Sequence, residues 1–271
     1  MYENLSPEPI RRLNEAVMTW KSWAPAPTTI PVLTAQLGGD TNLSFLVTDG
    51  RNQWVVRLND DRDSGINRTN ELAALTAAHN AGIAPAIIFN GQNILVAEYF
   101  SGHSPTLLDI AEIGSRFADI HSLEVSVQPM DLMKHLRAYY QQITKDTDIV
   151  NCYKKISALA APDASTTVLC HQDLTLHNMI RTKDRIVVID WEYAAMSDPA
   201  YDLAVFSYTH ELNESQFSLF LDNYYRIEPE LPDRVHYFEK IYALIEILWW
   251  LTRGKRQDEK IVRLQTLLEM R

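Results

Sequence analysis

The most informative stretch of the chain is His171-Gln172-Asp173-Leu174-Thr175-Leu176-His177-Asn178, followed twelve residues later by Asp190 at the end of Ile186-Val187-Val188-Ile189. An H-x-D triplet alone is common. The full order H-x-D-x-x-x-x-N, then four apolar residues and an aspartate, is specific. It predicts a loop followed by a short buried strand, with a carboxylate, an amide and a second carboxylate held close together.

These three side chains suit phosphoryl transfer from a magnesium nucleotide. One carboxylate orients the attacking hydroxyl, while an amide oxygen and a carboxylate bind the metal. We therefore predict that Asp173 is the catalytic base and that Asn178 and Asp190 are Mg²⁺ ligands. The alternatives are a loop turn at Asp173 and a helix cap at Asn178, and the combined spacing disfavours both. A zinc site from His171, Asp173 and His177 is also conceivable, but it lacks a clear fourth ligand.

Bulk properties narrow the class of protein. The chain has 271 residues, 46% hydrophobic and 22% charged, which suits a soluble globular protein with one two-lobed domain or two small ones. The net charge of −10 and the pI of about 5.3 argue against nucleic acid or an anionic membrane as partner. Two cysteines without a C-x-x-C pair make a disulfide scaffold or a zinc site improbable. We find no signal peptide or membrane span and expect a cytoplasmic protein, with its oligomeric state left open.

The remaining pattern divides the chain in two near Ser101-Gly102. The first part, residues 1–100, shows a helix over 5–23, then strand patterns separated by glycine turns and one inserted helix over 70–81. The strands are expected at 32–37, 43–48, 53–58, 86–89 and 94–99. The second part, residues 101–271, is mainly helical, with short strands at 168–170 and 186–189. Its helices are expected at 107–121, 132–143, 148–159, 200–212, 214–225, 233–253 and 256–270. The fold class is α+β.

With these pieces in order, the chain resembles the group of choline kinases, thiamine kinases and aminoglycoside phosphotransferases, which shares the protein-kinase-like fold. The resemblance covers roughly residues 30–210. It rests on the motif above and on Gly38-Gly39-Asp40-Thr41-Asn42, Arg57, Glu71, Glu98-Tyr99-Phe100, Asp190-Trp191-Glu192-Tyr193 and Asp198-Pro199 with Asp202.

The resemblance implies two lobes, a sheet-containing nucleotide lobe and a helical lobe with the catalytic loop, and ATP as co-substrate with Mg²⁺. It implies that Arg57, supported by Glu71, steadies the phosphates and that His171 and Asp202 support the catalytic loop. The other implied ATP-binding residues are Gly38, Gly39, Thr41, Asn42, Glu98 and Phe100.

The acceptor site is expected on the helix at 233–253. Tyr242, Glu246, Trp249 and Trp250 share one face of it, and with Glu192 they are the candidate acceptor residues. Aromatic rings and a carboxylate together can hold a cation. The equally weighted alternative is a core helix whose Glu246 is paired with a cation such as Arg253.

We therefore predict a small-molecule kinase that moves the γ-phosphate of ATP to the hydroxyl of a cationic alcohol of the choline or thiamine type. An aminoglycoside or other amino sugar is the alternative acceptor. A non-catalytic nucleotide- or metabolite-binding module and a zinc hydrolase are the alternatives from other classes.

Overall fold

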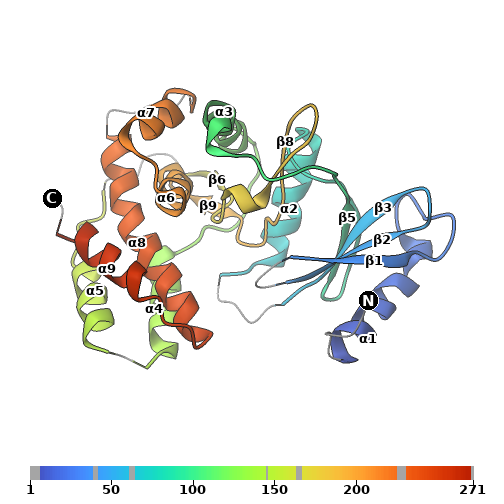
Figure 1. Ribbon diagram of the computed structural model, residues 1–271, viewed down its shortest axis with the longest axis horizontal. Helices are drawn as coiled ribbons and strands as arrows, with labels where there is room; N and C mark the ends of the chain where they lie inside the picture. Colours follow the sequence, from blue (N-terminus) through green and yellow to red (C-terminus); the bar gives the residue numbers. More distant parts are fainter. Residues whose placement is uncertain are drawn as a thin grey trace.

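A computed structural model of the chain describes residues 7–38, 42–60, 65–144, 146–162, 167–224 and 230–269. Figure 1 shows two lobes, a β-sheet flanked by helix α1 and a larger helical body, joined by the chain that leaves strand β5. We call them the N-lobe and the C-lobe. The predicted α+β, kinase-like fold class is confirmed.

The N-lobe is built on a five-stranded antiparallel sheet with strand order β1-β2-β3-β5-β4. The strands are β1 (Val32–Leu37), β2 (Leu43–Thr48), β3 (Gln53–Leu58), β4 (Ile87–Gly91) and β5 (Ile94–Glu98). In β3, Trp54, Val56 and Leu58 alternate toward a buried cluster that includes Leu13 and Ala16 of α1 (Pro7–Met18). This period-two burial on one face fixes the register of the sheet, so the arginine between them, Arg57, faces the other way.

Helix α2 (Arg68–Asn80) is inserted between β3 and β4 and carries Glu71. Asn67 begins it, because its side chain accepts hydrogen bonds from the backbone N–H groups of Thr69 and Asn70. It ends next to Gly82, whose φ of +74° turns the chain toward β4. The cap places the helix start two residues before the predicted one.

The C-lobe is helical and encloses the larger core. Its long helices are α3 (Ile110–His121), α4 (Leu132–Gln142), α5 (Thr147–Ser157), α6 (Pro199–His210), α7 (Glu214–Asp222), α8 (Leu231–Thr252) and α9 (Asp258–Leu267). Helix α6 is buried from Pro199 to Tyr208 and lies against α8. Asp198 caps α6 through the Ala200 N–H and also binds Arg234 of α8, so the two helices are fixed to each other.

Two pairs of very short strands hold the motif loops. Strand β6 (Val168–Cys170) pairs with β9 (Ala195–Ser197), and β7 (Met179–Arg181) pairs with β8 (Ile186–Val188). The sequence predicted β6 and β8 but not their partners. The first helix also ends earlier than predicted, at Met18, and a 3₁₀ turn, η1 (Trp20–Ser22), follows it. Among the described helices, none is both long and apolar enough to cross a membrane.

Candidate active site

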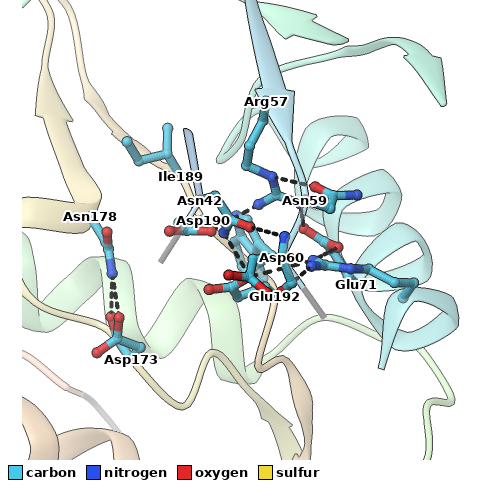
Figure 2. Close-up of polar contacts among 12 residues, drawn as sticks. Asn42, Arg57, Asn59, Asp60, Glu71, Asp173, Asn178, Ile189, Asp190 and Glu192 are labelled. Carbon is cyan, nitrogen blue, oxygen red and sulfur yellow. Dashed lines mark hydrogen bonds and ion pairs between the residues drawn. The ribbon is translucent and has the colours of Figure 1, made fainter. Parts of the chain in front are cut away.

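Asp173 lies on the loop after β6, and Asn178 is the last residue of the 3₁₀ turn η3 (Leu176–Asn178) that follows it. The Nδ2 atom of Asn178 donates to the backbone O and to Oδ2 of Asp173, each at 2.8 Å (Figure 2). The amide oxygen of Asn178 therefore stays available. Asp173 is half-buried, and burial together with the charge of Asp190 raises its pKa to about 7, against the opposing effect of the Asn178 hydrogen bond.

The loop is held from behind by Asp202 on α6. Its two carboxylate oxygens accept the backbone N–H groups of His171, at 2.7 Å, and Gln172, at 2.8 Å. His171 Nε2 donates to the carbonyl of Ile189 at 3.0 Å, and its Nδ1 accepts the Asp173 N–H at 3.4 Å. Both ring nitrogens of His171 are therefore used within the loop, and neither is directed toward a possible zinc site. Burial lowers the pKa of the His171 ring. His177 is exposed.

Arg57 connects the sheet to the second motif aspartate. Its guanidinium pairs with Glu71 of α2, donates to Asp190 Oδ1 at 2.8 Å and donates through Nε to Asn59 Oδ1 at 2.9 Å (Figure 2). Arg57 is 8% exposed and Glu71 is 2% exposed, so the pair is buried. Asp190 has a φ of +62°, a left-handed conformation that turns the chain after β8.

Glu192 lies on the N-lobe side of this turn. Its Oε2 accepts the Nδ2 of Asn42 at 2.7 Å, and Arg68 approaches at 3.4 Å. Burial and the charge of Asp190 raise the pKa of Glu192 to about 8. Glu192 thus lies apart from the α8 residues with which the sequence grouped it, because the turn at Asp190 sends it toward Asn42. Asn42 in turn accepts the Asp60 N–H at 3.0 Å, so both ends of its amide have protein partners.

A cavity of about 1020 Å³ brings most of the candidate residues together. The N-lobe lines it with Gly38, Asn42, Arg57, Glu71, Glu98 and Phe100, and the motif loops line it with Asp173, Asn178 and Asp190. Helix α8 adds Tyr242, Glu246, Trp249 and Trp250. Gly39 and Thr41, the other predicted nucleotide residues, lie outside the described residues.

The cations next to α8 differ from the expectation. Glu246 Oε1 pairs with Lys260 of α9 at 2.7 Å, where the sequence suggested Arg253. Arg253 stacks over the ring of Trp249, 3.6 Å from its centroid, and Lys255 lies 4.8 Å from the centroid of Trp250. Helix periodicity could not identify Lys260, because it comes from a separate helix that packs beside α8.

Sequence reasoning also missed cavity-lining residues from other elements. These are His135 and Tyr139 of α4, Tyr193, Tyr201 of α6, and Gln172, the variable position of the H-x-D triplet. The available signals were the place of Gln172 beside Asp173 and the place of Tyr193 in the motif Asp190-Trp191-Glu192-Tyr193.

The fold and the cavity define a kinase-like phosphotransferase. The profile described as "APH: Phosphotransferase enzyme family" matches residues 33–237, and the chain belongs to that family. The family resemblance predicted from the motif is thereby confirmed.

Individual proteins agree with this assignment. The chain is 31% identical over 147 residues to the protein LicA homolog of Mycoplasma capricolum, covering 52% of this chain and 61% of that protein. The choline kinase LicA from Streptococcus pneumoniae has the same fold, with a TM-score of 0.79, 20% identity and coverage of 94% of this chain and 99% of that one. A choline/ethanolamine kinase family protein from Mesorhizobium loti also has this fold. Its TM-score is 0.73, its sequence identity is 22%, and the match covers 95% of each chain.

Proposed function

We propose that the protein transfers the γ-phosphoryl group of ATP, bound with Mg²⁺, to the hydroxyl of a small cationic alcohol of the choline or thiamine type. One observation carries the proposal. Asp173, Asn178 and Asp190 line the same cavity as Arg57 from the sheet and as the aromatic and acidic residues of α8. A single space therefore offers groups for a nucleotide phosphate, a divalent ion and an acceptor.

Asp173 is the proposed base. Its carboxylate accepts the proton of the acceptor hydroxyl as the hydroxyl oxygen attacks the γ-phosphorus, while the bond from that phosphorus to the β,γ-bridging oxygen breaks and ADP leaves. The two hydrogen bonds from Asn178 and the bracing of the loop by Asp202 fix its direction. A pKa of about 7 is favourable for this role, since a base works best when its pKa is near the working pH.

The proposed metal ligands are the amide oxygen of Asn178 and the carboxylate of Asp190. The donor set fits Mg²⁺, which takes hard oxygen ligands and completes its shell with water and phosphate. When bound, the ion neutralises charge on the transferring phosphoryl group. Arg57 contributes a fixed positive charge toward the phosphates, and Glu71 holds its guanidinium in place.

The acceptor part of the proposal depends on α8. Tyr242, Trp249 and Trp250 supply aromatic surface, and Glu246 supplies a carboxylate whose side chain is 18% exposed. Partly buried negative charge with aromatic walls favours a cation. Glu98 and Phe100, at the end of β5, are the proposed adenine-binding segment on the opposite lobe.

A coupled ADP-release screen tests the proposal. The wild-type protein with Mg·ATP is offered choline, ethanolamine, thiamine, amino sugars and aminoglycosides. We expect acceptor-dependent ADP release with at least one small cationic alcohol. Asp173→Asn should lower kcat by roughly 10²- to 10⁴-fold while leaving ATP affinity nearly unchanged. Turnover with aminoglycosides alone would support the alternative acceptor. No acceptor-dependent release, or equal release by the variant, would overturn the proposal.

A further inference from the structure

One side chain of α2 is bonded to the backbone of the C-lobe. The Nδ2 atom of Asn70 donates to the carbonyl of Gln128 at 2.9 Å, and its Oδ1 accepts the Gln128 N–H at 2.9 Å. Asn70 is 4% exposed, so water does not readily replace either bond if it is lost. The amide of Asn70 therefore attaches the first turn of α2 to the C-lobe at two atoms.

The packing of α2 agrees with this attachment. Its buried side chains Ala74, Leu75 and Ala78 belong to the same buried cluster as the C-lobe helices, whereas the sheet face toward α1 forms a separate cluster. The carbonyl of Ile83, just after the helix, accepts the N–H of Val188 in β8 at 2.8 Å. Although α2 is inserted between two strands of the N-lobe sheet, the C-lobe holds it near both ends (Figure 1).

The segment that Asn70 binds belongs to a backbone ladder that also supports the two motif aspartates. Met130 donates its N–H to the carbonyl of Met196 in β9 at 3.2 Å, and the Met196 N–H donates to the Gln128 carbonyl at 3.4 Å. Strand β9 pairs in turn with β6. Asp173 follows β6 closely, and Asp190 comes shortly before β9. Short paths through this ladder therefore connect the bonds of Asn70 to both aspartates.

Asn70 also restrains the direction of its neighbour Glu71. Successive residues of an α-helix are turned by about 100° around its axis. A helix whose first turn is bonded to Gln128 therefore presents the next side chain in one direction. Glu71 is 2% exposed and pairs with Arg57 of the sheet, and its Oε2 accepts Arg68 Nη1 at 2.7 Å. Both of its carboxylate oxygens are thus engaged with arginines.

Resting on the proposed function, we propose that Asn70 is a positioning residue for the nucleotide phosphates. It holds Glu71, and through Glu71 the guanidinium of Arg57, at a fixed position relative to the two motif aspartates. The arginine that meets the phosphates is therefore in place before the nucleotide binds, and α2 does not have to move to assemble the site.

Binding of Mg²⁺ with the non-hydrolysable analogue AMP-PNP, measured by isothermal titration calorimetry, tests the inference without an acceptor. Asn70→Leu keeps the approximate size of the side chain without its hydrogen-bonding atoms. It should raise the Kd about tenfold, because a displaced guanidinium meets the phosphates poorly. The matched control Asn80→Leu, at an exposed position of the same helix, should keep the wild-type Kd.

A milder variant keeps the test usable if Asn70→Leu does not fold. Asn70→Asp retains an acceptor for the Gln128 N–H but loses the donor, and a carboxylate in the first turn favours the helix itself. Its Kd should lie between those of the wild type and Asn70→Leu. A wild-type Kd in a folded Asn70→Leu, or in Asn70→Asp where only that variant folds, would overturn the inference.

A double-mutant cycle with Glu71→Gln separates positioning from a general loss of structure. If Asn70 acts through Glu71, Asn70→Leu should change the Kd by less than about twofold in the Glu71→Gln protein. The full separate effect in the double variant would overturn the inference and leave the proposed function standing. A wild type that binds the nucleotide but phosphorylates no acceptor would overturn the proposed function alone, and one that binds no nucleotide would overturn both.

Discussion

In its proposed role as the base, Asp173 must be ionised, so its pKa as well as its position should govern activity. Its half-buried carboxylate faces a hydrogen bond from Asn178 but also the negative charge of Asp190, and burial and that charge raise its pKa to about 7. Only the ionised carboxylate can accept a proton from the acceptor hydroxyl. The protonated form, which dominates below pH 7, has no such capacity.

With acceptor saturating, we therefore expect kcat/KM for Mg·ATP to rise with pH through a midpoint near 7 and to level off above it. This ratio reports the enzyme before the metal nucleotide binds, which is the state in which this pKa applies. Initial rates at subsaturating Mg·ATP between pH 5.5 and 8.5 measure it, and Asp173→Asn should lose the rising limb along with most of its activity. A wild-type profile that stays flat from pH 6 to 8 would contradict the assignment of Asp173 as the base.

At the scale of elements, helix α6 supports the motif loop at both ends. Near its start Asp202 binds the loop backbone, and at its end His210 accepts the Leu176 N–H through Nε2 at 3.1 Å. That bond fixes the first residue of η3, the turn that carries Asn178. Burial, and then the nearby charge of His177, lower the pKa of His210 to about 4.

This lowered pKa predicts a pH-dependent stability. Between about pH 6.5 and pH 4 the unfolded chain binds a proton at His210 that the folded protein does not, so stability falls as the pH falls through this window. The contribution lost between pH 7 and pH 5 is at most about 2 kcal/mol, from the stated shift. His210→Gln keeps a hydrogen-bond acceptor for the Leu176 N–H, and this acceptor does not titrate. In this variant the free energy of unfolding, measured with urea at pH 7 and pH 5, should fall less than in the wild type. An identical loss in both proteins would contradict the prediction.

The same scale explains what the sequence could and could not predict. Most sheet strands and the amphipathic helices, such as α3 and α4, follow apolar periods that burial enforces, so they were predictable. Helix α6 is buried from Pro199 to Tyr208 and was recognised by its apolar length after Pro199. Strands β7 and β9 have three residues each and exist only through pairing with β8 and β6. The sequence gives no sign of the positive φ values of Gln172 and Asp190, because neither residue is a glycine. The sequence could therefore name Asp173, Asn178 and Asp190 as candidates, but not the direction of Glu192 or the place of Gln172 in the cavity wall.

At the scale of the whole molecule, several buried or half-buried polar contacts connect the lobes. Arg57 of β3 binds Asp190, while Asn42 and, at 3.4 Å, Arg68 of α2 contact Glu192, so the N-lobe is attached to the segment after β8 at more than one point. Three of these residues, Arg57, Asp190 and Asn42, also line the cavity, at the end proposed for the phosphates. A nucleotide bound there would contact residues that join the lobes. Its binding free energy should therefore stabilise both lobes against unfolding.

Mg·ATP should therefore raise the melting temperature of the whole chain, by about 5 °C at a concentration near 100 times its Kd. Asp190→Asn keeps an oxygen for Arg57 but weakens the metal site, and it should lose most of this shift while unfolding near the wild-type temperature without ligand. Asp184→Asn, the same change in an exposed turn between β7 and β8, should keep the shift, and EDTA should reduce the shift in the wild type and in Asp184→Asn. Differential scanning fluorimetry measures the three proteins without ligand, with Mg·ATP, and with Mg·ATP and EDTA. An Asp190→Asn protein with the full magnesium-dependent shift would show that the carboxylate of Asp190 does not bind the ion.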